Sequence, residues 1–262
     1  MTRLTAALLL SAFAATPALA QSPFDGTWKA DLSSLTMPQK PDVFAVKSGV
    51  YTCESCVPRI EVPADSVRHA VTGHPYYDQI AVRVVDPRTI RVAQRLRGKL
   101  MFLGESKVSP DGKTLAFAFR DTSSPVGKVV VGHGTEHRVG AAPAGAHAVS
   151  GSWQADKMQD ITDAGLIVTF KTAGDTLHMS TPTGQSYDAR IGGPAVPVQG
   201  DPAGTMAAVK RLSATSLQET DTRAGKVVGV MTMTAAPGGR SMTVVWDDRV
   251  QGTVQTYKAN KQ

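Results

Sequence analysis

Apolar and polar residues alternate with a period of two along most of the chain. The clearest runs are "QIAVRVV" (79–85), "TIRVAQRL" (89–96), "TLAFAF" (114–119) and "SMTVVW" (241–246). Alternation of this kind predicts β-strands with one face toward a core. No segment sustains a period of 3.6, and short helices are expected at most around 33–37 and 156–165.

Turn signals separate these runs at short and even spacing. "PDGKT" (110–114) and "PGGRS" (237–241) read as hairpin turns, and "DPR" (86–88) separates two of the alternating runs. Many short strands with regular turns predict an all-β sandwich or barrel.

A short sequence segment near the start of the chain recurs near its middle. "FDGTWKADL" (24–32) returns as "VSGSWQADK" (149–157), with an offset of 125. "SPDGKTLAFAFRD" (109–121) similarly faces "APGGRSMTVVWDD" (236–248), with an offset of 127. Such a nearly constant register predicts an internal duplication.

The repeat predicts where the chain divides. The Ala-, Gly- and Pro-rich segment 141–148 carries no strand pattern and is the expected linker. The expected units are a first repeat over 21–140 and a second repeat over 149–262. Residues 1–20 have one basic residue, an apolar run and a small-residue Ala-x-Ala end, which is the pattern of a secretory signal peptide. The expected location is therefore the periplasm or the medium.

Each repeat opens with Gly-x-Trp, at Gly26–Trp28 and at Gly151–Trp153. This opening on a first strand resembles the lipocalin and fatty-acid-binding-protein (calycin) barrels. The resemblance implies two tandem antiparallel barrels of about eight strands each. It also implies that each Trp closes one end of a barrel beneath a basic residue of the last strand, here Arg138 and Lys258. The joint pattern of the repeats also resembles a group of uncharacterised exported bacterial proteins, which implies no activity.

The two cysteines, Cys53 and Cys56, are the only ones in the chain. Export predicts a disulfide between them. Two alternatives stay open: a thiol-redox site, because the spacing is Cys-x-x-Cys, and a zinc site in which His133 and His137 complete a Cys₂His₂ set.

Three tyrosines are the candidate ligand contacts of the first repeat. Tyr76 and Tyr77 lie in "HPYYD", which is the main departure of the first repeat from the second, and Tyr51 stands just before the cysteines. Aromatic rings at a barrel mouth can stack on a bound molecule.

Charge and motifs narrow the function classes. The chain has a formal net charge of +6, and its densest basic segment places Arg91 and Arg95 on one strand face. That face lacks the interleaved aromatics that nucleic-acid binding uses, so no nucleic acid is expected. The nucleophile-elbow, zincin, P-loop and dinucleotide motifs are missing, so no catalytic residue and no cofactor is predicted.

The leading hypothesis is an exported binding protein that holds a small apolar or amphipathic ligand inside a lipocalin-like barrel. One alternative is an envelope structural or interaction protein that uses its outer sheet faces and the basic face of Arg91 and Arg95. A second alternative is a redox or metal-binding protein centred on the cysteines. No transmembrane segment is expected, and no protein partner is identified.

Overall fold

The computed structural model of the chain describes residues 22–262, so the predicted signal peptide at 1–20 lies outside the described residues. The described part is all-β, as the alternation predicts, and its strands form two antiparallel sheets of ten strands each. This exceeds the expected number of about eight per barrel, because each sheet ends in short strands of two to five residues. Two short 3₁₀ helices accompany the strands: η1 (Leu32–Ser34) and η2 (Asp163–Gly165).

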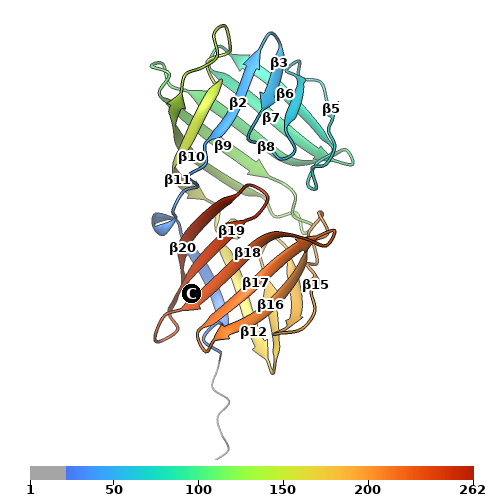
Figure 1. The fold of residues 1–262 in the computed structure, drawn as a ribbon, viewed down its shortest axis with the longest axis vertical. Helices are drawn as coiled ribbons and strands as arrows, with labels where there is room; N and C mark the ends of the chain where they lie inside the picture. The colour runs from blue at the N-terminus through green and yellow to red at the C-terminus, as the bar shows by residue number, and fades with distance from the viewer. Residues whose placement is uncertain (1–21) are drawn as a thin grey trace, which may run out of the picture.

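Each sheet curls into a nearly closed barrel (Figure 1). The first barrel holds β2 (Asp42–Lys47), β3 (Val50–Cys53), β4 (Ile60–Pro63), β5 (His69–Ala70), β6 (Gln79–Asp86), β7 (Thr89–Leu96), β8 (Lys99–Val108), β9 (Thr114–Asp121), β10 (Val130–Gly140) and β11 (Gly151–Ile161). The second barrel holds β1 (Gly26–Asp31), β12 (Ile167–Ala173), β13 (Thr176–Ser180), β14 (Ser186–Arg190), β15 (Val196–Pro197), β16 (Met206–Ser213), β17 (Ser216–Arg223), β18 (Lys226–Ala235), β19 (Ser241–Asp248) and β20 (Thr253–Lys261).

The two barrels exchange their opening strands. β1 pairs with β12 and β20 of the second barrel, whereas β11 pairs with β10 and β2 of the first barrel. The sequence repeats expected at 21–140 and 149–262 therefore do not coincide with the barrels. The first barrel is continuous over 42–161, and the second is assembled from 26–31 and 167–261.

The exchange sets the barrels end to end. β1 and β11 each run from their Gly-x-Trp start toward the waist of the molecule, where η1 and η2 follow them and the chain crosses into the other barrel (Figure 1). The Trp-bearing ends therefore point away from each other, and the opposite ends face each other across the waist. We call the facing ends the junction.

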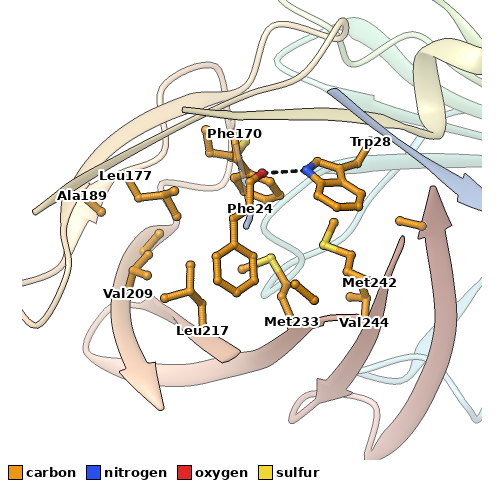
Figure 2. Packing of buried hydrophobic residues seen from close by; sticks show 14 of the residues in the cluster. Phe24, Trp28, Phe170, Leu177, Ala189, Val209, Leu217, Met233, Met242 and Val244 are labelled. Carbon is orange, nitrogen blue, oxygen red and sulfur yellow. Dashed lines mark hydrogen bonds between the residues drawn. The ribbon is translucent and has the colours of Figure 1, made fainter. Parts of the chain in front are cut away.

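Each barrel has its own buried core at the Trp-bearing end. In the second barrel Phe24 and Trp28 are fully buried and pack with side chains from most strands (Figure 2). Trp153 has the same place in the first barrel, where Ile80, Ile90 and Leu115 belong to its cluster. Burial of these large side chains is the main stabilising term of each barrel.

Few polar contacts cross the junction. The Tyr76 hydroxyl lies 2.8 Å from an Arg223 nitrogen, and the Ser124 hydroxyl donates to the Thr183 carbonyl at 2.8 Å. Among residues 22–262, no helix is long and apolar enough to cross a membrane.

The strand exchange can be tested by cross-linking. Thr27 pairs with Thr169, and their side-chain oxygens lie 3.0 Å apart. A Thr27→Cys/Thr169→Cys variant is therefore expected to form a second disulfide on oxidation, detected by peptide mapping. Thr27→Cys/Val43→Cys is the control, because Val43 would face Thr27 only if each repeat kept its own opening strand. Cross-linking of the control pair instead would contradict the exchanged arrangement.

Candidate functional site

The Gly-x-Trp openings close the outer ends of the barrels. Each indole nitrogen donates to a backbone carbonyl four residues earlier, Trp28 to Phe24 at 2.7 Å and Trp153 to Val149 at 2.8 Å. The dashed line in Figure 2 marks the first of these bonds. The buried donors are thereby satisfied, which fixes the orientation of each ring.

A basic side chain covers each ring. The Arg138 guanidinium lies 4.0 Å from the centre of the Trp153 ring, and the Lys261 ammonium lies 4.9 Å from that of Trp28. The predicted Lys258 is wrong, because on β20 it stands three residues from the residue that covers Trp28. Arg138 covers the tryptophan of the other repeat, since β11 has moved into its barrel.

The glycine of the opening makes room for the cation. Gly151 has a φ of +142°, and a Cβ there would collide with the Arg138 guanidinium. Gly26 has a φ of +128°, and a Cβ there would lie 3.1 Å from Cε of the Lys261 side chain. Only glycine adopts such a backbone without strain, so the glycine, the ring and the cation form one structural unit. The unit closes a barrel and carries no chemistry of its own.

The two closing cations differ in what they bond. Arg138 donates to the carbonyls of Gly112 at 2.6 Å, Ser150 at 2.6 Å and Ala148 at 2.8 Å. No hydrogen bond of the Lys261 ammonium occurs in the described part of the chain. We predict that Arg138→Met costs about 2–4 kcal/mol of unfolding free energy, against about 0.5–1 kcal/mol for Lys261→Met. Denaturant titration measures both, and equal losses would contradict the assigned role of the three carbonyl bonds.

The second barrel contains a cavity of about 470 Å³ toward the junction. Its walls are largely apolar and include four methionines, Met179, Met231, Met233 and Met242. Three leucines of the crossing segments, Leu32, Leu35 and Leu166, also line it. The strand exchange therefore supplies part of the wall, since η1 and η2 lie next to these leucines.

A buried acidic pair stands on one side of this cavity. Glu219 lines it and accepts a hydrogen bond of 2.5 Å from the Tyr187 hydroxyl. Asp221 follows two residues later on the same face of β17. Burial and the charge of Asp221 raise the pKa of Glu219, and burial also raises that of Asp221. The pair therefore holds a proton at higher pH than two separate carboxyls do.

The first barrel contains a different pocket of about 360 Å³, also toward the junction. Its lining includes the disulfide, the aromatic rings of Phe44, Tyr51 and Phe117, and the carboxyls of Asp42 and Glu136. Gln251 and Thr253 of the second barrel complete one side. The pocket is more polar than the methionine-lined cavity.

Glu136 is the most perturbed group of this pocket. Its side chain is 8% exposed, and its Oε2 has no hydrogen-bond partner within residues 22–262. Burial, with the charges of Asp42 and Asp156, raises its pKa to about 8. Burial also raises the pKa of Asp42, which Ser55 partly offsets by a hydrogen bond. The pocket thus holds two carboxyls that resist ionising together.

The three predicted ligand contacts fall at two places: Tyr51 lines one pocket, and Tyr76 and Tyr77 line another. Tyr51 is buried and lines the pocket of the first barrel. Tyr77 packs beside the same core with its hydroxyl 3.0 Å from His74 Nδ1. Tyr76 has its ring 4.9 Å from the Arg223 guanidinium across the junction, and it lines a pocket of about 230 Å³ there together with Tyr77. Only Tyr51 therefore lines either interior cavity.

The cysteines form the predicted disulfide. Cys53 is only 5% exposed, and both sulfurs line the pocket of the first barrel. The zinc alternative is not supported, since the sulfurs are bonded to each other and His137 bonds Asp156 at 2.5 Å. His133 is exposed on β10, and residues 22–262 hold no group of three or more metal-ligating side chains.

The basic face of the first barrel is partly neutralised. Arg91 donates to Glu105 at 2.6 Å across β7 and β8, and Arg95 donates to the Gly98 carbonyl at 2.9 Å. Their charges are thus engaged within the barrel, which leaves less free positive potential for an anionic partner.

The acidic groups of the two barrels occupy different positions. Glu219 on β17 pairs with Val209 on β16. At the corresponding position of the first barrel Val92 on β7 pairs with Val82 on β6, so Val92 stands in place of the acid. Glu136 faces Leu115 on β9, and the matching residue opposite Met242 is Ala259. Neither acid is among the predicted site residues, although the sequence carries a signal: each stands where an alternating strand calls for an apolar residue.

Comparison with protein-family models, with curated proteins and with solved structures finds no match for the chain.

The raised pKa of Glu136 predicts that the difference in unfolding free energy between Glu136→Gln and the wild type depends on pH. A carboxyl whose pKa rises from 4.5 to about 8 on folding stabilises the fold fully below 4.5, and this contribution is lost as the pH rises through 8. Glutamine mimics the protonated form at every pH. Glu136→Gln is therefore expected to match the wild type near pH 4.5 and to exceed its unfolding free energy by about 2–4 kcal/mol above pH 8. A pH-independent difference in denaturant titrations would contradict this assignment.

Proposed function

We propose that the protein is an exported binding protein that holds a small apolar or amphipathic molecule in the second barrel. The cavity of about 470 Å³ carries this proposal, because its largely apolar wall includes four methionines and ends at the acidic pair. Ligand pockets of proteins have this composition: apolar walls with few placed polar groups. Methionine side chains adapt to molecules of different shape, which favours a ligand class over a single compound.

The acidic pair indicates which end of the ligand is polar. Glu219 is 5% exposed, and burial with the charge of Asp221 raises its pKa, so it favours the neutral, protonated form. A neutral carboxyl donates and accepts hydrogen bonds. Asp31, Thr181, Gln255 and Tyr257 also line the cavity, but among its polar lining residues Glu219 is the buried one. The proposed ligand therefore has an apolar body and one uncharged hydrogen-bonding group.

The remaining parts of the proposal rest on the sequence. The pattern of residues 1–20 supports export to the periplasm or the medium. The repeated Gly-x-Trp openings support a duplicated, lipocalin-like origin. Closing units of similar composition at both outer ends agree with that origin.

Fluorescence titration with N-phenylnaphthylamine tests the proposal. The fluorescence of this neutral apolar probe increases when the probe moves from water into an apolar site. The wild type is expected to bind it in a saturable manner. Met231→Trp fills the cavity and is expected to lower the affinity by about tenfold or more, because the probe then loses most of its buried area.

Thr232→Trp is the matched control. Thr232 follows Met231 on β18 and points to the opposite face of the strand, so the same ring is placed outside the barrel. The control is expected to bind like the wild type. Equal affinity of Met231→Trp and the wild type, or the absence of saturable binding, would contradict the proposal.

A further inference from the structure

We infer that the first barrel holds a second binding site, of different chemistry, for a small organic cation. The site is the pocket of about 360 Å³ at the junction end of this barrel. It is separate from the methionine-lined cavity, with which it shares no lining residue.

The first observation is an unsatisfied buried carboxyl. Glu136 lines the pocket, is 8% exposed, and has an Oε2 atom without a hydrogen-bond partner among the described residues. Buried carboxyl oxygens are nearly always bonded, so an unpartnered one is a place that the positive charge or a donor group of a ligand can occupy. Asp42 brings a second carboxyl to the same pocket, where its only side-chain partner is the Ser55 hydroxyl at 3.4 Å.

The second observation is the aromatic wall. Phe44 and Tyr51 lie with ring centres 6.3 Å apart, and Phe117 stands two positions from Leu115, which pairs with Glu136. A Cβ at Gly134 would come within 2.5 Å of the Phe117 ring. Gly134 therefore leaves room for this ring, which lines the pocket together with Glu136. Ring faces attract cations, and most strongly where water is excluded.

The lining favours an organic cation over other ligands. An anion would meet two carboxyls. A Ca²⁺ or Mg²⁺ ion needs six or more oxygen ligands, and here two carboxyls stand among aromatic rings and a disulfide. The one basic side chain of the lining, Lys40, has its ammonium 3.0 Å from the Gln251 carbonyl on the rim. An ammonium group with apolar substituents matches both the carboxyls and the rings.

The second barrel lacks this combination. Strand pairing shows which residues correspond between the barrels. Ala259 stands at the position of Glu136, Val168 at that of Asp42, and Leu177 at that of Tyr51. Its own acids stand on β17 among methionines. The cation site is therefore a property of the first barrel.

Calorimetric titration of the full exported protein tests the inference, with choline as the cation. Dimethylbutanol, in which carbon replaces the quaternary nitrogen, is the uncharged probe of the same shape. Choline is expected to bind and dimethylbutanol is not. Glu136→Gln is expected to weaken choline binding by about tenfold or more, because a desolvated charge pair is lost. Asp42→Asn should weaken it as well.

The pH dependence gives a second readout. Choline binds the ionised carboxyl, so its affinity is expected to rise as the pH approaches 8 and then level off. The other titratable groups facing Glu136 are Asp42, Tyr51 and Asp156, with Lys40 at the rim. In Glu136→Gln the choline affinity is expected to change little with pH. If ionisation of Asp42 alone caused the increase in affinity, that increase would persist in this variant.

Glu219→Gln is the matched control, because it removes the buried acid of the other barrel. It is expected to leave choline binding unchanged. Loss of choline binding in this variant, equal binding of choline and dimethylbutanol, or no choline binding at millimolar concentration would overturn the inference. Binding of N-phenylnaphthylamine by Glu136→Gln shows independently that the second barrel is folded. Loss of the cation site is therefore distinguishable from loss of the apolar site.

Discussion

The exchange of the two opening strands is the constraint on which the rest of the structure depends. Without β11 the first barrel would expose the edges of β10 and β2, and without β1 the second would expose those of β12 and β20. Unpaired edges are sites of aggregation, so each half of the chain completes the other. The same exchange forces two crossings at the waist and thereby sets the barrels end to end.

This arrangement places the closed cores and the cavities at opposite ends of each barrel. The outer ends carry Trp28 and Trp153 in closed cores, each beneath a cation. The junction ends carry the cavities and the buried carboxyls of Glu136 and Glu219. Since the acids stand at different positions in the two barrels, the barrels share a frame and differ in the chemistry of their interiors.

Much of the fold was predictable from local pattern, since strand alternation reports which face is buried. The strand partners of β1 and β11 were not, because pairing with either barrel buries the same side of Trp28 or Trp153. The resemblance implied Lys258 where Lys261 covers Trp28, because likeness near the end of a strand does not show which residue reaches the ring. Glu136 and Glu219 were missed because an acid at an apolar position is informative only once its face is known to be interior.

Nuclear Overhauser contacts of the two buried indoles in methyl-labelled protein test the exchange most directly, in the native sequence. Trp28 is expected to show contacts to the methyl group of Met242, which lies beside its ring in Figure 2. Trp153 is expected to show contacts to the methyl groups of Ile90 and Leu115. Contacts of Trp28 to Ile90 and Leu115 would place β1 in the first barrel and contradict the account.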